Sequence, residues 1–183
     1  MLFAGEIIEG FYHDAPELRS ILLTHSTQVK EKALELASGV DFELNMQLIA
    51  TGAMLHDIGI ITCCAPDIYC FGSNPYITHG IAGAAMLRQL SAELEPFARI
   101  CERHTGSGLT AAEIVRAGLP LPEMDMLPET LEEKVICLAD KFFSKSGKMK
   151  EKPLPVIRKQ MEKFGAGSLC RFDELCQLFK VKG

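Results

Sequence analysis

Tryptophan is absent from this sequence, tyrosine is scarce, and positive charge does not dominate. Among 183 residues there are three tyrosines and no tryptophan, and the net charge is −5. Proteins that bind nucleic-acid backbones usually present clustered Lys and Arg, and those that bind single strands add aromatic rings on which bases stack. The composition therefore argues against a nucleic-acid polymer as a partner, and we expect none.

No two cysteines have the Cys-x-x-Cys spacing of a zinc ribbon. The chain has seven cysteines, and because that number is odd, a complete set of internal disulfides is not indicated either. Reduced thiols are typical of the cytoplasm. We therefore expect a cytoplasmic protein that relies on its hydrophobic core for stability.

Long apolar runs are missing as well. No stretch has the roughly 20 apolar residues that a membrane helix needs. The first ten residues, MLFAGEIIEG, lack a basic start and carry Glu6 within their apolar part, unlike a secretory signal. The sequence thus predicts no membrane partner.

Helical periodicity, by contrast, runs through most of the chain, and alternation with a period of two residues is scarce. The chain is 48% hydrophobic and 23% charged, so it can bury a sizeable core. We predict an all-α, compact helical bundle formed by a single domain, 1–183, with its core at about 14–147 and C-terminal helices at 150–181 packed on it. The predicted helices run from an Asp14 cap to Gly39, over roughly 43–57, 78–90 and 94–104, from a Thr110 cap, and over roughly 130–145, 154–164 and 168–180.

Four of the five histidines fall on the apolar stripes of four different predicted helices. Each has apolar neighbours three, four or seven residues away, so each should point into the core. One inward histidine is most often a core residue whose hydrogen bonds are satisfied, but that explanation is weaker for four at once. The inward histidines are His25, His56, His79 and His104, whereas His13 lies in a polar stretch.

Two carboxylates fall on the same inward faces. Asp57 follows His56 directly, and Asp140 aligns with the apolar Ile136 and Phe143. A buried carboxylate needs a cation or several hydrogen-bond donors, and few inward Lys or Arg are available to supply them. A metal site in the core would satisfy all six side chains together: His25, His56, Asp57, His79, His104 and Asp140.

Six ligands around one octahedral ion would leave no open position, and a closed site is structural. Sharing the ligands between two divalent ions leaves room for water. Nitrogen and oxygen ligands without thiolates suit Fe, Mn, Co, Ni or Zn, and we interpret the nearby Cys101 as a packing residue. The predicted division places His25, His56, Asp57 and Asp140 on the first ion, and Asp57, as a bridge, with His79 and His104 on the second.

The ordered set of His, His-Asp, His, His and Asp, each on its own helix, resembles the HD superfamily of metal-dependent phosphohydrolases. The resemblance spans roughly 20–147, and the HDIG at 56–59 is the usual label of a subgroup. The segments THG at 78–80, HTG at 104–106 and LADKF at 138–142 are also similar to HD-type symmetrical diadenosine tetraphosphatases. His25, His56, Asp57 and Asp140 match the superfamily's shared ligands, and His79 and His104 match the two extra histidines of its binuclear branch.

The sequence departs from many HDIG phosphodiesterases at one informative position. Those proteins have a lysine directly after the glycine, where it commonly contacts phosphate, whereas this chain has Ile60. The GYP element of cyclic di-GMP phosphodiesterases is also absent. The substrate therefore cannot be predicted from the motif.

The resemblance implies an enzyme that hydrolyses a phosphoester of a small, nucleotide-like or other anionic substrate, with a hydroxide activated by two metal ions. Asp57, His79 and His104 are the predicted catalytic residues. A phosphate would also need cations from the protein. Lys145 is the first predicted substrate contact, followed by Arg103 and Lys141.

Two other functions stay open at this point. HD-type di-iron oxygenases, similar to myo-inositol oxygenase, use the same four histidines and two aspartates to activate dioxygen. In a non-catalytic binding module, the metal would only hold helices together. The oligomeric state is open as well, with a homodimer as one alternative.

Overall fold

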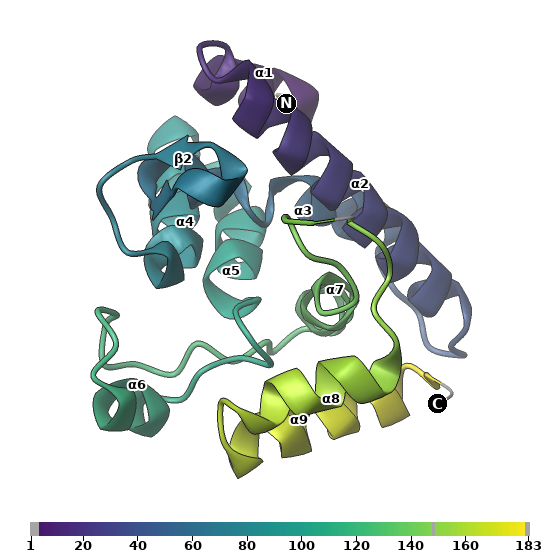
Figure 1. Cartoon of the computed structure of the whole chain (residues 1–183). Coiled ribbons are helices and arrows are strands. Elements are labelled where there is room, and N and C mark those ends of the chain that lie inside the picture. The colour runs from purple at the N-terminus through teal and green to yellow at the C-terminus, as the bar shows by residue number, and fades with distance from the viewer. Residues whose placement is uncertain (1–3, 148, 182–183) are drawn as a thin grey trace.

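α-Helices make up almost all regular structure in the computed structural model, which describes residues 4–147 and 149–181 (Figure 1). The prediction of an all-α fold is confirmed, with one small antiparallel hairpin added. The α-helices are α1 (Ala4–Tyr12), α2 (Pro16–Ser38), α3 (Met46–Leu55), α4 (His79–Leu90), α5 (Glu95–Arg103), α6 (Ala111–Ala117), α7 (Leu131–Asp140), α8 (Leu154–Glu162) and α9 (Ala166–Leu178). The short 3-10 helices are η1 (Ile58–Thr62), η2 (Pro66–Ile68), η3 (Tyr76–Thr78) and η4 (Ala92–Leu94), and the strands are β1 (Cys64–Ala65) and β2 (Cys70–Phe71).

Two large clusters of buried apolar side chains form most of the core of the described residues, beside a small third cluster around Ile114. One surrounds α7 and includes Val29, Ile136 and Phe172, and the other lies under α1 and α4 and includes Ile8 and Leu87. Helices α2, α3 and α5 contribute to both clusters. A polar group on one of these three helices, near the point where the two clusters meet, is therefore shielded from water on several sides.

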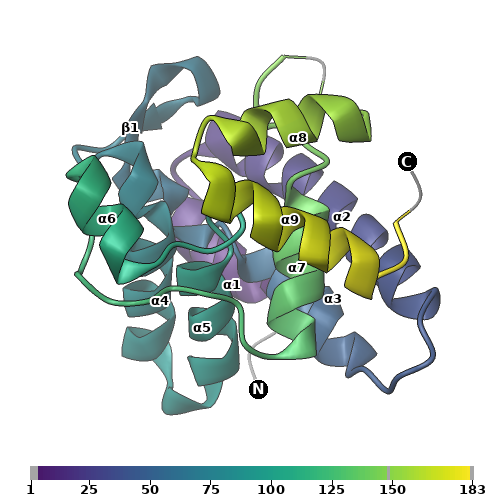
Figure 2. The same cartoon turned by 90° about the horizontal axis from the view of Figure 1, so that it is seen from below.

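The C-terminal helices pack on the part of the chain before them. Figures 1 and 2 show α8 and α9 side by side, covering α7. Ile157 of α8 and Phe172 of α9 are fully buried in the cluster around α7. The single domain 1–183 stays a prediction, and it includes residues outside the described ranges.

Helix ends are where sequence and structure differ most. The helix predicted at 43–57 is α3, which begins after Asn45 because the Asn45 side chain accepts a hydrogen bond of 3.0 Å from the Leu48 amide. The helix predicted at 130–145 ends at Asp140. The Asp14 cap is wrong: α2 follows Ala15, and the Asp14 carboxylate instead lies 2.8 Å from His13 Nε2.

Other predicted helix ends are confirmed. Thr110 begins α6 with a capping box, in which it accepts from the Glu113 amide while the Glu113 carboxylate accepts from the Thr110 amide. Gly39 ends α2. Within the described ranges, none of the helices has both the length and the apolar character to cross a bilayer. A cytoplasmic location stays a prediction.

Neither helix α1 nor the β1–β2 hairpin was predicted from the sequence. Helix α1 carries Tyr12, which contacts η1. The Tyr12 hydroxyl donates to the Ile58 carbonyl at 2.7 Å and accepts from the Ile61 amide at 3.2 Å. Tyr12 is fully buried. Its two hydrogen bonds fix η1, the turn that follows the His56–Asp57 pair.

Tyr12→Phe is expected to lower the free energy of unfolding by about 1–2 kcal/mol, because the Ile58 carbonyl would lose its buried partner. Denaturant unfolding of the variant and the parent measures this difference. Tyr69→Phe is the matched control, since Tyr69 is 51% exposed and should change stability little. Equal losses in both variants would contradict the role of Tyr12 in holding η1.

Candidate metal centre

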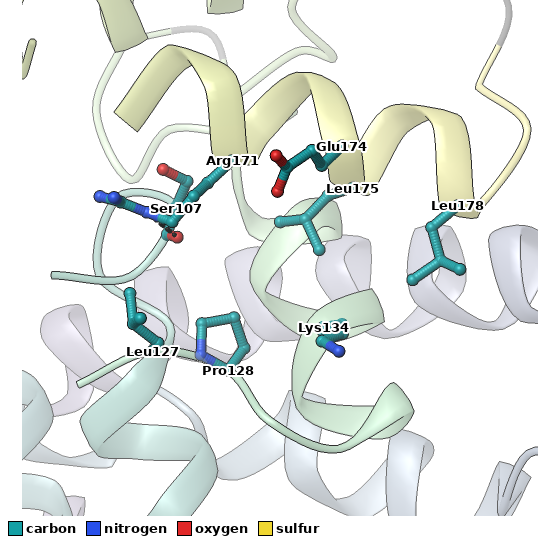
Figure 3. A pocket seen from close by; sticks show the side chains of 8 residues that line it. All are labelled: Ser107, Leu127, Pro128, Lys134, Arg171, Glu174, Leu175 and Leu178. Carbon is teal, nitrogen blue, oxygen red and sulfur yellow. Dashed lines mark hydrogen bonds between the residues drawn. The ribbon is translucent and has the colours of Figure 1, made fainter. Parts of the chain in front are cut away.

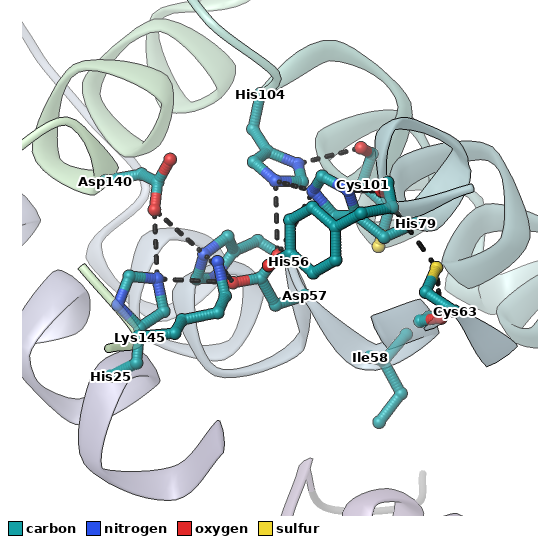
Figure 4. Close-up of polar contacts among 12 residues, drawn as sticks. His25, His56, Asp57, Ile58, Cys63, His79, Cys101, His104, Asp140 and Lys145 are labelled. Carbon is teal, nitrogen blue, oxygen red and sulfur yellow. Dashed lines mark hydrogen bonds and ion pairs between the residues drawn. The ribbon is translucent and has the colours of Figure 1, made fainter. Parts of the chain in front are cut away.

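The four inward histidines and two aspartates meet in the core, contributed by segments far apart in the sequence (Figure 4). Only His25 lies in the middle of a helix, α2. His56 and Asp57 follow α3, His79 is the first residue of α4, His104 follows α5, and Asp140 is the last residue of α7. Possible ligand atoms within 4.8 Å of one another form two sets: His25, His56, Asp57 and Asp140, and Asp57, His79 and His104.

Asp57 belongs to both sets because its two carboxylate oxygens face different histidines. Oδ2 lies 3.0 Å from His56 Nε2 and 3.2 Å from His25 Nε2. Oδ1 lies 3.4 Å from Nε2 of both His79 and His104. The residue is fully buried. This is the arrangement that a carboxylate bridging two cations requires.

Two glycines let the backbone segments approach closely enough to bring these side chains together. A Cβ on Gly59 would lie 2.2 Å from the His79 carbonyl oxygen, so η1 packs directly on the start of α4. A Cβ on Gly80 would lie 2.4 Å from the Cys101 carbonyl oxygen, so α4 packs equally closely on the end of α5. These contacts bring His79 next to both Asp57 and His104.

Gly59→Ala is therefore expected to displace α4 and to lose most of the metal bound by the parent protein. Metal content per chain, measured by mass spectrometry after dialysis, tests this. Gly10→Ala is the control, because a Cβ at Gly10 meets nothing within 4 Å. A Gly59→Ala variant with the parent's full metal content would show that this backbone contact does not position the cluster.

Three of the histidines have their ring orientation fixed by the backbone. In each, Nδ1 faces the carbonyl oxygen of the residue three positions earlier, at 2.7 Å for His56, 2.7 Å for His79 and 2.8 Å for His104. A carbonyl oxygen only accepts, so Nδ1 carries the proton, and in the neutral ring Nε2 presents a lone pair to the cluster. Metal-binding histidines are commonly oriented in this way.

The charge states fit a cation. Burial lowers the pKa of His79 to about 3, although Asp57 opposes the shift, and burial also lowers the pKa of His104. Both rings are then neutral at pH 7, and their Nε2 lone pairs face each other at 3.0 Å. Two lone pairs at this distance repel unless a positive charge lies near both.

The carboxylates make the centre strongly attractive to positive charge. Burial opposes protonation of His56, but Asp57 and Asp140 raise its pKa to about 9. Although burial also opposes ionisation of the two carboxyls, His56 and Lys145 hold the pKa of Asp57 well below its usual range. Within the described ranges, His56 Nε2 and Asp57 Oδ1 make no contact with hydrogen-bond geometry, although both are buried. The donor set thus fits divalent metal ions.

Comparison with known proteins agrees with this geometry. The family model described as HD domain matches residues 22–144. The chain belongs to the HD domain family. The matched range contains all six residues of the cluster, so the resemblance to the HD superfamily predicted from the sequence is confirmed.

Three relatives of the HD domain chain are informative. An uncharacterized protein of Methanocaldococcus jannaschii is 38% identical over 65% of this chain and 64% of its own length. Two tRNA (cytidine(56)-2'-O)-methyltransferases, from Picrophilus torridus and Thermoplasma volcanium, are 35% and 33% identical over 68% and 70% of this chain. The chain matches only 32% and 33% of their length. No solved structure gives a significant match.

Two of the three predicted substrate contacts lie at the cluster of the HD domain. Lys145 Nζ is 2.5 Å from Asp57 Oδ2 and 5.9 Å from the centre of the Tyr76 ring. Lys141 Nζ is 2.6 Å from Asp140 Oδ2 and donates to the His104 carbonyl at 3.0 Å. Lys141 is buried, so it holds ligand-bearing segments together and has little room for a substrate.

The structure does not bring Arg103 to the cluster. Its guanidinium donates to the Leu127 carbonyl at 2.6 Å and to the Glu129 carboxylate at 2.9 Å. The Arg103 guanidinium therefore points away from the cluster, although the adjacent His104 faces inward. Substrate binding by Arg103 stays a prediction that these contacts do not support.

Sequence analysis missed Tyr76. Its ring stacks on that of His79, with ring centroids 4.9 Å apart and an angle of 29° between the planes. Its carbonyl accepts the hydrogen bond from His79 Nδ1. Tyr76 begins the short 3-10 helix η3, which directly precedes α4, and a helix of three residues is too short for periodicity to show the direction of a side chain.

Proposed function

We propose that this HD domain hydrolyses a phosphoester of a small anionic substrate, using two divalent metal ions. The observation that carries the proposal is the fully buried Asp57 carboxylate, whose two oxygens face two separate pairs of histidines. Such ions supply a water of lowered pKa as nucleophile and stabilise charge on the phosphoryl oxygens. Iron, manganese, cobalt, nickel and zinc all suit these ligands.

In this proposal, the residues of the cluster have separate roles in binding metal and in catalysis. His25, His56 and Asp140 would hold one ion, His79 and His104 would hold the other, and Asp57 would contribute a carboxylate oxygen to each. The hydrogen bonds from Nδ1 to backbone carbonyls keep three of the rings in place before metal arrives. Burial keeps bulk water away from the cluster. We assign the catalytic roles to Asp57, His79 and His104, because this second set has three protein ligands against four in the first and so leaves more coordination positions for water and substrate.

Lys145 is the proposed phosphate contact. Its ammonium is held at the cluster, where burial opposes the charge but Asp57 raises its pKa above the ordinary value. The segment Ser144–Lys145–Ser146 also lines an open cavity of about 350 Å³ beside Tyr76. A ligand in this cavity would therefore lie against Lys145.

Lys145→Ala is expected to raise KM about tenfold for an anionic substrate, since one charge-assisted hydrogen bond contributes about 1.5–3 kcal/mol. Steady-state kinetics with saturating metal gives this value. Lys159→Ala is the control, because Lys159 is an exposed lysine on α8. An unchanged KM for Lys145→Ala would remove its assigned role.

Methyl transfer is the named activity of two relatives, but we do not propose it for this chain. The match covers about a third of those methyltransferases, and the cluster of four histidines and two carboxylates suits metal-dependent hydrolysis. We also propose that the substrate is a small molecule and that no nucleic-acid polymer is bound. Bulk tRNA is included in the test below because its hydrolysis would contradict this part.

A screen of nucleotides, generic phosphodiesters and bulk tRNA with Mn²⁺, Fe²⁺ and Co²⁺ tests the proposal. We expect phosphate or alcohol release from a small phosphoester that depends on added metal. Oxygen uptake by the iron-loaded protein with an organophosphonate or a polyol, without any phosphoester hydrolysis, would instead establish the oxygenase. Metal binding without either activity would favour the binding module.

A further inference from the structure

A cavity of about 470 Å³ lies beside the candidate metal centre, and His79, Thr105 and Gly106 contribute to its wall. Its volume is typical of a site for a small organic molecule. Most of its lining surface is apolar, and the apolar and aromatic residues that contribute to it are Tyr76, Ile77, Leu109, Ala117, Leu119 and Phe164.

One wall of this cavity comes from a part of the chain outside the family match. Lys163, Phe164 and Ser168, from the α8–α9 turn and the start of α9, line it, whereas the HD domain match ends at 144. Phe164 is 57% exposed, so its ring is accessible to a molecule in the cavity that it lines. The C-terminal helices therefore do more than cover α7.

Hydrogen bonds hold this wall in place. Ser107 Oγ donates to the Ser168 carbonyl at 2.7 Å, and Arg171 donates to the carbonyls of Ser107 and Gly108 at 3.2 and 3.0 Å. Arg171 also pairs with Glu113 of α6 at 2.8 Å. Figure 3 shows Arg171 and Ser107 at a second, smaller cavity of about 210 Å³. Residues of α7 and α9 are among those that line it. The larger cavity is thus formed before any ligand arrives.

Two cations stand at the edge of the larger cavity. The side chains of Arg116 and Lys163 are exposed and make no hydrogen bond or ion pair within the described part of the chain. The one carboxylate in the lining, that of Glu113, is already neutralised by Arg171. The edge therefore carries a net positive charge, which attracts an anionic molecule.

We propose that this cavity binds the bulky apolar, preferably aromatic, group of a phosphoester whose phosphate lies at the metal centre. This inference rests on the function proposed above. The Tyr76 ring connects the two parts, because it stacks on His79 and also lines the cavity. A mainly apolar wall offers few partners to the polar edge of a nucleobase, so the preferred substrate is the ester of an apolar alcohol.

Binding of two phosphonates that cannot be hydrolysed tests the proposal. Isothermal calorimetry on the Mn²⁺-loaded protein compares methylphosphonate with 1-naphthylphosphonate. We expect the naphthyl compound to bind about ten- to a hundredfold more tightly, because burial of an aromatic group of this size contributes about 1.5–3 kcal/mol.

Ala117→Trp fills the cavity from the exposed α6 and should bring the two affinities close together, with methylphosphonate binding unchanged. Val115→Trp, at a position on the same helix that is 55% exposed and outside the lining, should keep the naphthyl preference. Phe164→Ala removes a wall residue and should weaken naphthyl binding, whereas Val156→Ala on α8 should not.

Equal affinities for the two phosphonates in the parent, or an undiminished preference in Ala117→Trp, would overturn the cavity's role while leaving phosphoester hydrolysis standing. Failure of both phosphonates to bind, together with no hydrolysis of any phosphoester, would overturn the proposed function and the cavity's role with it. Methylphosphonate binding to the parent distinguishes these two outcomes, because methylphosphonate binds in the first and does not bind in the second.

Discussion

Replacing Asp57 by alanine is expected to abolish the binding of both metal ions. The reason is geometric, because Oδ2 faces His25 and His56 while Oδ1 faces His79 and His104. Without this carboxylate, neither set of ligands keeps a bridging negative charge. Metal content by mass spectrometry should fall from two ions per chain to a trace.

Asp41→Ala is the matched control for this prediction. Asp41 is an exposed carboxylate that pairs with Lys180, so its loss should leave the metal content unchanged. Circular dichroism of both variants checks that the helices persist. An Asp57→Ala protein that still binds two ions would rule out the bridging assignment.

His79→Ala should remove mainly the second ion and lower kcat by more than about a hundredfold, because loss of a group that only supports a ligand already costs about 10–100-fold. The first ion should remain, since His25, His56 and Asp140 do not depend on His79 for their positions. Metal analysis and steady-state kinetics on one preparation give both values. His13→Ala is the control, because His13 is exposed and pairs with Asp14 instead of a residue of the cluster.

The informative contrary result for His79→Ala is full activity with one ion. That outcome would show that a single ion on the first set of ligands performs the chemistry. The four ligands of that set would then have to leave an open position for water, and His104 would have no catalytic role.

The six residues of the cluster could be predicted because they lie on or next to helices whose apolar residues align with them at helical spacing. An inward histidine on such a helix has few places to point except the core. His25 and Asp140 are separated by 115 positions in the sequence, yet each could be placed from its own helix alone. In the structure, His25 Nε2 lies 2.9 Å from Asp140 Oδ1. The division of ligands around Asp57 followed from the need for an open coordination position.

Features that depend on irregular segments could not be predicted. Tyr76 lies in the three-residue helix η3, and the cavity beside it is lined by η3, α6, the loop after α5 and the α8–α9 turn. How these segments come together depends on contacts remote in sequence. Arg103 was placed at the cluster because of its position before His104, and the structure turns it to Glu129 instead. The predicted start of α3, at about 43, was also wrong, because the Asn45 side chain caps the helix and sets its first residue. Apolar periodicity does not show the position of such a cap.

The structure explains why this chain can have Ile60 where many HDIG phosphodiesterases have a lysine. Ile60 is fully buried in the apolar cluster under α1 and α4, so it does not face a substrate. The cation at the cluster is supplied instead by Lys145, from the loop after α7. A lysine directly after the HDIG glycine is therefore not required for a positive charge beside Asp57.

Titration of metal-stripped protein with Mn²⁺, with bound metal and phosphoester hydrolysis followed together, tests the central claim most directly. A generic diester such as bis(p-nitrophenyl) phosphate serves as substrate, alongside any better one that the screen finds. Our account predicts that two equivalents bind and that hydrolysis appears as the second equivalent is taken up. Saturation of both signals at one equivalent, or binding of two equivalents without hydrolysis of any phosphoester, would contradict it.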